Sequence, residues 1–367
     1  GFEWAEEDSS TFHSPAPFVR EGCRVELRAS GRSFTAAAAD GLIGLMERDP
    51  KVVAATAAMP EGTGLDKVME RFPERVWDTG ICESHALDMM AGLAKTGYKP
   101  FFAVYSTFFQ RAFDQAFQEV ALQGLAVRLL LDRAGLVGGD GAVHHGFCDV
   151  ALLRTLPEAV VMAAIDEPSL RAALEFMRGH EAGVSSVRYP RDTVCGRLAD
   201  GPCPPFELGR ARALTPELEP DEACEAPACA VLAFGTPALD ALAAAERLAG
   251  EYRVAVYDAR FAKPVDRELV RRLLSDGVPI VTVEDHALIG GFGAAVLEAA
   301  QEMGLDASGV VRLGLPDAWI IQDPRPVQLA EAGIDAAGIV RAVRQARDRR
   351  EGQAPGAPPV PASQTRG

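Results

Sequence analysis

Helical and strand-like segments alternate along most of this sequence, and no other feature constrains the fold as strongly. Apolar side chains recur at helical spacing in residues 33–48, and residues 52–56 form a short apolar run of strand length. In the first half, the expected helices are 33–48, 81–97, 109–123 and 168–180, and the expected strands are 52–56, 99–106, 125–133 and 160–165. This alternation predicts a parallel sheet with helices on both faces, which is the doubly wound α/β fold.

A second block of the same kind follows a segment rich in Pro, Glu and Cys, so the sequence predicts two doubly wound α/β domains. Its expected strands are 229–235, 252–260 and 279–286, and its expected helices are 238–250, 266–277 and 290–304. At 367 residues the chain is long enough for two such cores. We place a connector at 1–34, the first domain at 35–196, a linker at 197–227, a smaller second domain at 228–345 and a disordered tail at 346–367.

The start of the chain has the character of a cut end. It begins at Gly1 rather than Met, and its first residues are acidic and show no helix or strand pattern. Pro15 and Pro17 break any helix that follows.

Charge and cysteine content narrow the function. The formal net charge is −15, so the surface repels phosphate backbones and anionic lipid, and nucleic acid is not an expected partner. The seven cysteines are odd in number and show no CxxC spacing, and we find neither a signal peptide nor an apolar run of membrane-spanning length. We therefore expect a reduced, cytoplasmic protein that does not enter a membrane.

The first polar cluster is DTGICESHALDMMAGLA, residues 78–94. Glu83 lies there where a strand gives way to a helix, and the carboxyl edge of a parallel sheet is where such folds bind ligands. A buried acid at this position could protonate a ring nitrogen. The alternative is a structural carboxylate that complements the helix dipole.

A second cluster, residues 103–115, contains Tyr105, Phe108 and Arg111. An aromatic side chain at the end of a strand can stack on a flat heterocycle, and an arginine near a helix start can bind a phosphate. These residues could equally be ordinary core and surface residues. A later turn, residues 186–192, offers Arg188 and Arg191 to an anionic substrate, with an exposed turn of solvated charges as the alternative.

A third cluster, residues 129–146, is a buried strand that leads into a glycine-rich loop with Asp140, His144 and His145. Closely spaced glycines let a backbone approach a ligand, and histidines are plausible proton carriers. The loop lacks the GxGxxG spacing of a dinucleotide site, and the two histidines lack a third ligand for zinc, so we assign no metal to this chain. The glycine-rich turn at 283–298 favours close packing of a helix or a subunit contact over a phosphate site.

Together these segments resemble the 1-deoxy-D-xylulose-5-phosphate synthase family. The strings that carry the resemblance include FHSPAPF, AAMPEGTGL, FPERVWDTGICESHA, GYKPFFAVYSTFFQRAFDQ, DRAGLVGGDGAVHHGFCDVALLRTLP, VRYPR, DARFAKP and LGLPDAWI. They keep the family's order and cover residues 1–342. The resemblance implies a thiamine-diphosphate pyrimidine-binding domain at 35–196 and a transketolase-like C-terminal domain at 228–345.

The resemblance also implies roles for individual residues. Glu83 matches the glutamate that binds the pyrimidine N1′ of the cofactor, Phe108 matches the aromatic that stacks on the pyrimidine, and Met59 and Ile81 match other cofactor-binding positions. Tyr105, Arg111, Arg133 and Arg191 match substrate-binding positions, of which Arg133 and Arg191 match those that hold the phosphate of glyceraldehyde 3-phosphate. Asp140, His144 and the connector residue His13 match catalytic positions.

The sequence departs from the family pattern in three ways. Ser84 stands where the family has Gln, and Glu284, Asp285 and His286 stand where it has EEN. The family's diphosphate and Mg²⁺ site needs a GDG followed by Asn, and this sequence contains no Asn at all. The resemblance therefore implies that the diphosphate half of the cofactor site lies on another domain or subunit.

The expected activity is that of a transferase in isoprene biosynthesis, which condenses pyruvate with glyceraldehyde 3-phosphate and releases CO₂. The chain alone is expected to be inactive, and with a diphosphate-binding domain or subunit it is expected to form a homodimer or heterotetramer. Two alternatives stay open. One is the β-type subunit of a split transketolase or 2-oxoacid dehydrogenase, and the other is a noncatalytic structural or regulatory subunit of the same fold.

Overall fold

The structure is a computed structural model that describes most of the chain. The described residues are 3–7, 18–21, 24–27, 31–196, 203–215 and 227–350. Within these ranges no helix has the length and apolar content needed to cross a bilayer. The five cysteines that are described are all free thiols.

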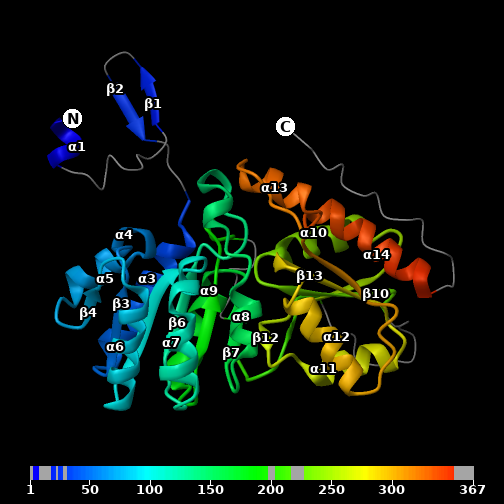
Figure 1. Ribbon diagram of the computed structural model, residues 1–367. Helices are drawn as coiled ribbons and strands as arrows, with labels where there is room; N and C mark the ends of the chain where they lie inside the picture. The colour runs from blue at the N-terminus through cyan, green and yellow to red at the C-terminus, as the bar shows by residue number, and fades with distance from the viewer. Residues whose placement is uncertain are drawn as a thin grey trace.

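A seven-stranded sheet forms the first half of the molecule (Figure 1). Its strands, in spatial order, are β12 (Phe261–Lys263), β7 (Val160–Ala163), β8 (Ser185–Arg188), β6 (Arg128–Asp132), β5 (Lys99–Tyr105), β3 (Val52–Thr56) and β4 (Val76–Asp78). All neighbouring pairs are parallel except β12 with β7. The carboxyl ends of the six parallel strands therefore meet at one edge.

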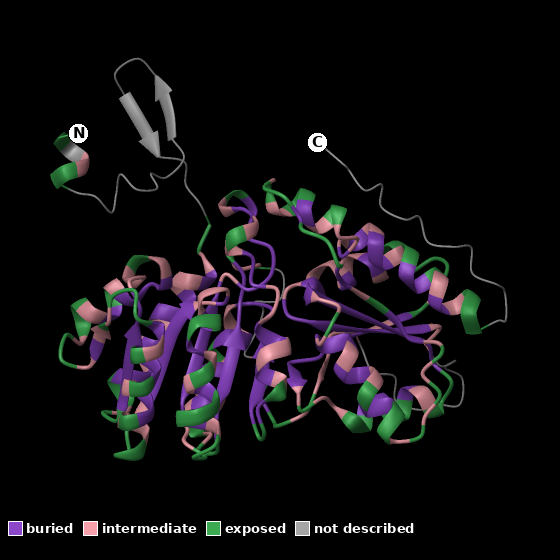
Figure 2. Cartoon of the chain, in the orientation of Figure 1, coloured by how far each residue is buried: buried purple, intermediate pink, exposed green. Residues whose placement is uncertain are grey.

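Helices cover both faces of this sheet, as the alternation in the sequence predicts. They are α3 (Phe34–Arg48), α4 (Pro60–Thr63), α5 (Leu65–Arg71), α6 (Glu83–Lys95), α7 (Phe113–Gln115), α8 (Asp149–Thr155) and α9 (Glu167–Gly179), with the short turns η1 (Phe108–Ala112), η2 (Ala116–Ala121), η3 (Gly138–Asp140) and η4 (Ala142–His144). Successive strand residues face opposite layers: Phe101 packs with α3, α5 and α9, and Phe102 packs with α6 and α8. Figure 2 shows the inner strands of this sheet coloured as buried. The predicted doubly wound α/β fold is confirmed.

A five-stranded sheet forms the second half. Its strands, in spatial order, are β14 (Val311–Leu315), β13 (Ile280–Ala287), β10 (Cys229–Phe234), β11 (Val254–Asp258) and β9 (Arg212–Ala213), and its helices are α10 (Pro237–Leu248), α11 (Arg267–Ser275), α12 (Phe292–Glu302), α13 (Arg325–Glu331) and α14 (Ala336–Arg350). Only β9, at the edge, runs antiparallel to its neighbour. Helices α10 and α14 pack on one face, and α11 and α12 pack on the other.

The two halves share one core. Strand β12 belongs to the second half in sequence, yet it pairs with β7 of the first sheet. One cluster of buried side chains runs from Leu129 in β6 to Val270 in α11 and Phe292 in α12. The halves are therefore joined by packing as well as by the chain.

Three segments differ from the sequence expectation. Residues 1–34 contain a short helix, α1 (Glu3–Glu7), and an antiparallel hairpin of β1 (Phe18–Glu21) and β2 (Arg24–Leu27), where we expected irregular chain. A glycine between two short runs is a hairpin pattern that we did not recognise. Helix α14 extends to Arg350, past residue 345, where we placed the end of the second domain, and Ala346 is buried in the core.

The third difference concerns residues 109–123. We expected one helix, and the structure has a 3₁₀ turn, one α turn and a π turn in succession. The Arg111 carbonyl accepts a hydrogen bond from Ser84 Oγ at 2.8 Å, which draws it toward α6. Such irregular turns occur frequently at functional sites.

Candidate functional site

Most of the predicted site residues lie at the carboxyl edge of the seven-stranded sheet. Met59 follows β3, and Ile81 and Glu83 follow β4. The other predicted residues follow the next strands, with Tyr105, Phe108 and Arg111 after β5, Arg133, Asp140 and His144 after β6, and Arg191 after β8. The parallel arrangement gathers these residues at one edge, as in other folds of this class.

Glu83 begins helix α6 and is paired with Arg111. The Glu83 side chain is nearly fully buried, and Arg111 Nη1 donates to its Oε1 at 2.5 Å. The Arg111 guanidinium also lies 4.7 Å from the centre of the Phe108 ring. A planar cation with N–H donors thus contacts the carboxylate and the aromatic ring together.

An aromatic group adjoins this ion pair. The rings of Tyr105 and Phe108 stack at 5.5 Å and 14°, and the His144 ring meets Phe108 edge-on at 5.7 Å. A Cβ on Gly62 would lie 2.2 Å from the Tyr105 hydroxyl, so this approach of α4 requires glycine. Burial raises the pKa of Tyr105, and Arg133 opposes that shift only in part.

Arg133 lies against the face of Tyr105, 4.2 Å from the ring centre. It has a left-handed backbone with φ of 57°, and it pairs with the Asp132 carboxylate at 3.0 Å and donates to Thr35 Oγ1 at 3.2 Å. Burial lowers the pKa of Arg133, but Asp132, Tyr105 and Asp140 together outweigh burial and the pKa is raised overall. Burial raises the pKa of Asp132, which Arg133 opposes. Arg133 therefore keeps its charge at the site.

The glycine-rich loop brings Asp140 to Arg191. Arg191 Nη1 lies 3.0 Å from Asp140 Oδ1, and His144 Nδ1 lies 3.1 Å from the Asp140 carbonyl. His145 is turned away and buried: the Val137 N–H bonds its Nδ1 at 3.3 Å, and its Nε2 meets the Ile320 carbonyl at 3.2 Å. The Val137 N–H makes Nδ1 an acceptor, and burial lowers the pKa of His145, so of the two histidines in this loop His144 is the candidate proton carrier.

Three predicted residues make none of the contacts described above. Arg188 does not reach a substrate, because it is buried and pairs with Asp149 at 2.9 Å. Ile81 lies at the correct edge, but its side chain is 76% exposed. Met59 is half-buried at the start of α4. His13 lies outside the described residues.

Sequence reasoning missed the residues that support this site. Asp132 and Thr35 hold Arg133 in place, and Asp132 could have been noticed as a carboxylate at the end of an apolar strand. Asp285 and Arg325, from the second half, bind the glycine-rich loop at Leu136. No local pattern marks these two, because their partners are distant in sequence.

The glycine-rich turn at 283–298 is a close-packing site, as expected from its glycines. Glu284 accepts the N–H groups of Phe292 and Gly293 at 2.6 and 2.8 Å and so caps α12. A Cβ on Gly291 would lie 2.3 Å from Glu284 Oε2. Burial raises the pKa of Glu284 to about 7 and lowers that of His286 to about 4.

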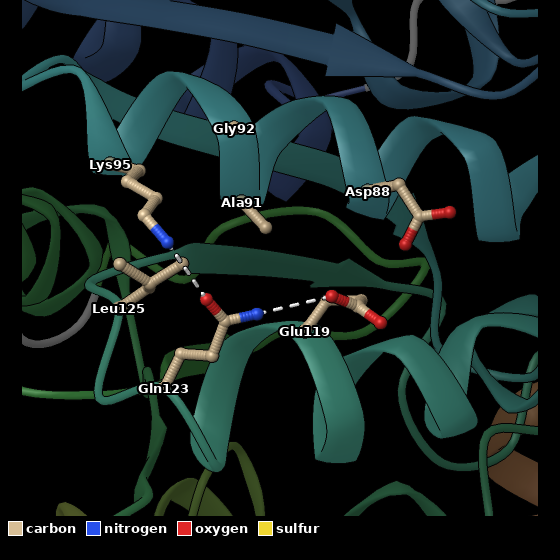
Figure 3. Close-up of a pocket in the computed structure, with 7 residues that line it drawn as sticks. All are labelled: Asp88, Ala91, Gly92, Lys95, Glu119, Gln123 and Leu125. Atoms are coloured by element: carbon tan, nitrogen blue, oxygen red, sulfur yellow. Dashed lines mark hydrogen bonds between the residues drawn. The ribbon is translucent and has the colours of Figure 1, made fainter.

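A separate cavity of about 440 Å³ opens along the later turns of α6, away from Glu83 (Figure 3). It is lined by Asp88, Ala91, Gly92, Lys95, Glu119, Gln123 and Leu125. Lys95 donates to Gln123 Oε1 at 3.3 Å, and Gln123 donates to Glu119 at 3.1 Å. None of the predicted site residues lines this cavity.

Comparison with known proteins gives matches to both halves of the chain. The family model "Transketolase, pyrimidine binding domain" matches residues 30–196, and "Transketolase, C-terminal domain" matches residues 221–339. The 1-deoxy-D-xylulose-5-phosphate synthase 1 of Geobacter sulfurreducens is 43% identical over 344 residues, which are 93% of this chain and 52% of that protein. The 1-deoxy-D-xylulose-5-phosphate synthase of Anaeromyxobacter sp. is 45% identical over 350 residues, 94% of this chain and 54% of that protein. The chain spans about half the length of the curated relatives it matches.

Solved structures agree with these matches. A protein described as a split gene transketolase, in an inactive β4 tetramer, superposes with a TM-score of 0.73 at 29% identity, over 87% of this chain and 99% of that chain. The transketolase of Leishmania mexicana superposes with a TM-score of 0.71 at 20% identity, over 94% of this chain and 49% of that chain, and it supports the fold alone. From its fold, its two matched domains and its relatives, the chain belongs to the transketolase family, alongside the 1-deoxy-D-xylulose-5-phosphate synthases.

Proposed function

We propose that this chain supplies the pyrimidine-binding and C-terminal domains of a thiamine-diphosphate-dependent 1-deoxy-D-xylulose-5-phosphate synthase. The reaction condenses pyruvate with glyceraldehyde 3-phosphate and releases CO₂. The observation that carries this proposal is the contact of Arg111 with both Glu83 and Phe108.

These residues fit the pyrimidine half of the cofactor. An aminopyrimidine resembles the Arg111 guanidinium in being planar and in presenting N–H donors. The Glu83 carboxylate and the Phe108 ring that now contact Arg111 can therefore hold the pyrimidine once Arg111 moves aside. Met59 and Ile81, at the same edge, are proposed as further contacts.

The chain's own residues then bind, orient and move protons. Glu83 holds a proton at the pyrimidine N1′, and Phe108 fixes the plane of the ring. When bound, thiamine diphosphate supplies a nucleophilic carbon and an electron sink for the decarboxylation of pyruvate. His144, beside Phe108, carries a proton to or from the reacting oxygen, and Asp140 orients the acceptor. His13 is proposed at the same site on the resemblance alone.

The acceptor's phosphate is proposed to bind Arg133 and Arg191, with Tyr105 beside them. Each of these guanidinium groups is paired with a carboxylate, Asp132 for Arg133 and Asp140 for Arg191, so the phosphate is proposed to bind beside these pairs. A guanidinium also matches a phosphate in geometry. Arg111, released from Glu83, is proposed to join this site.

The diphosphate and its Mg²⁺ are proposed to bind residues outside this sequence, on another domain or a partner subunit. No Asn is present to complete the expected motif after a GDG. A homodimer or heterotetramer is the proposed assembly. We place the reaction in the cytoplasm, in keeping with the free thiols of the described cysteines.

The test is reconstitution. The chain is mixed with the diphosphate-binding region of a relative, thiamine diphosphate and Mg²⁺, and deoxyxylulose phosphate is measured. We expect product from the mixture and none from the chain alone. Glu83→Gln should lower kcat at least about a hundredfold, whereas Glu119→Gln, in the cavity along α6, should not. Turnover by the chain alone would refute the divided site, and an active Glu83→Gln enzyme would indicate a noncatalytic subunit.

A second candidate is a split transketolase subunit. It is favoured by the split gene transketolase structure, 99% of which the chain covers. Substrate choice separates these candidates from each other. Use of a ketose donor would favour the split transketolase. Transfer to a lipoyl group would favour the other alternative, a 2-oxoacid dehydrogenase subunit. Pyruvate with glyceraldehyde 3-phosphate supports the proposed synthase.

A further inference from the structure

The glycine-rich loop that carries Asp140 and His144 is held by side chains from the second half of the chain. Within this loop they bond main-chain N–H and C=O groups of residues 136–139. The four side chains are those of Asp285, Gln322, Arg325 and Gln328. Because these hydrogen bonds go to the main chain, they set the path of the loop and leave the side chains of Asp140 and His144 free to face the site.

Arg325 connects more segments than the other three. Its side chain, at the start of α13, is 11% exposed. Its Nε donates to the Leu136 carbonyl at 2.9 Å, its Nη1 to Asp192 Oδ2 at 2.7 Å and its Nη2 to Asp285 Oδ2 at 2.7 Å. Asp285 in turn accepts the Leu136 N–H at 3.0 Å.

Two of these contacts bind the two loops that carry Asp140 and Arg191. Leu136 precedes Asp140 in the same loop, and Asp192 follows Arg191 in the chain. The paired side chains lie 3.0 Å apart although they come from different loops. We propose that Arg325 is a positioning residue that holds Asp140 and Arg191 at the spacing needed to act on the phosphorylated acceptor. The catalytic part of this inference rests on the function proposed above.

The local sequence fits this role. Only a guanidinium can donate in three directions from one planar group, so lysine cannot replace it fully. Gly135 has φ of 75°, and a Cβ there would lie 2.1 Å from the Asp285 carboxyl carbon. Glycine at this position therefore lets Asp285 approach the loop closely enough to bind both Leu136 and Arg325.

The first test needs only this chain. Arg325→Met keeps the length of the side chain and removes its donors. We expect the amides of residues 136–141 and 191–193 to exchange with deuterium about tenfold faster. The matched control is Arg349→Met, which removes an arginine that donates to the Val310 carbonyl at 3.2 Å, away from this loop.

A second variant tests the same contact with a smaller change to the fold. Asp192→Asn removes only the ion pair to Arg325, and Asp192 is 44% exposed, so the fold should survive. We expect faster exchange at residues 191–193 in this variant as well. Unchanged exchange in both variants would overturn the inference.

The second test uses the reconstituted enzyme and two acceptors. D-glyceraldehyde lacks the phosphate that Arg191 is proposed to bind. Arg325→Met should lower kcat/KM about tenfold for glyceraldehyde 3-phosphate and much less for D-glyceraldehyde, and Arg325→Lys should be intermediate. A general structural defect would lower both values equally, and that result would overturn the positioning role. If no mixture is active, the proposed function fails, and the exchange experiment alone decides whether Arg325 holds the loops.

Discussion

At the scale of single residues, the site is arranged around charges that already have partners. Glu83 is paired with Arg111, and Arg133 is paired with Asp132. A ligand must therefore displace a guanidinium or bind beside one. We therefore expect the affinity for the proposed cofactor to depend on Arg111.

Arg111→Leu should strengthen the binding of thiamine diphosphate to the reconstituted enzyme. The pyrimidine then no longer competes with a cation for Glu83. Arg111 is half-exposed, so the ion pair is worth at most about 1 kcal/mol, which corresponds to about a fivefold lower Kd. Titration of the cofactor in the presence of Mg²⁺ measures this.

The control for this prediction is Arg71→Leu. Arg71 pairs with Glu47 on the surface at 3.3 Å, and its loss should leave the Kd unchanged. Weaker cofactor binding in Arg111→Leu would show that Arg111 supports the cofactor rather than competing with it.

Gly62→Ala should disturb Tyr105. The added Cβ would lie 2.2 Å from the hydroxyl oxygen but 2.9 Å from the ring carbon that bears it. Overpacking of this kind costs about 1–3 kcal/mol of unfolding free energy, and removing the hydroxyl should recover part of it. Urea denaturation of Gly62→Ala and of Gly62→Ala with Tyr105→Phe tests this, and equal stabilities would contradict the predicted clash.

At the scale of elements, the sequence predicted the regular helices and strands well. Apolar periodicity determines β3, β5, β6 and α6, because burial of one face or both faces follows from local spacing. It failed at residues 109–123, where Ser84 of a neighbouring helix binds the Arg111 carbonyl. That contact depends on the tertiary fold, so no local pattern could reveal it.

Strand β13 contains two titratable residues, Glu284 and His286, whose pKa shifts make stability depend on pH. Burial raises the pKa of Glu284 from 4.5 to about 7 and lowers that of His286 from 6.5 to about 4. Their side chains lie 3.8 Å apart, and the charged groups around them are Arg154, Arg188 and Asp149. The two shifts act on stability with opposite signs.

Between pH 4.5 and 7 the folded state keeps a proton on Glu284 that the unfolded state has lost, so stability falls as the pH rises. Between pH 4 and 6.5 the unfolded state binds a proton on His286 that the folded state lacks, so stability rises. Each group contributes at most about 1.4 kcal/mol per pH unit, and the two largely cancel between pH 4.5 and 6.5. Relative to the unmodified chain, Glu284→Gln should therefore make stability rise with pH in this range, and His286→Gln should make it fall.

Urea denaturation at half-unit pH steps measures these slopes. At each pH, the free energy of unfolding of the unmodified chain is subtracted from that of the variant. This subtraction removes the contribution of other groups, such as Asp258, whose pKa burial also raises to about 7. Parallel curves for all three proteins would contradict the assigned shifts.

At the scale of the whole molecule, the sequence predicted two domains but not the way they join. Strand β12 crosses to the first sheet, and Asp285 and Arg325 reach the glycine-rich loop. These contacts link residues about 100 to 190 positions apart, and the pattern of each segment is satisfied without them. Local sequence patterns therefore predict the candidate residues on each loop and miss the contacts that hold the loops together.

The shared core predicts that both halves unfold together. One buried cluster includes side chains of β6, α11 and α12, so neither half can lose its structure without exposing apolar surface of the other. Amide exchange across a urea series should show peptides of β3 and β5 converting at the same concentration as those of β10 and β13. Phe261→Ala removes a fully buried ring in β12 and should lower both midpoints together, at a cost of about 3–5 kcal/mol. The control is Phe117→Ala, at an exposed ring, which should change neither midpoint much. Separate transitions for the two halves in the unmodified chain would contradict the prediction.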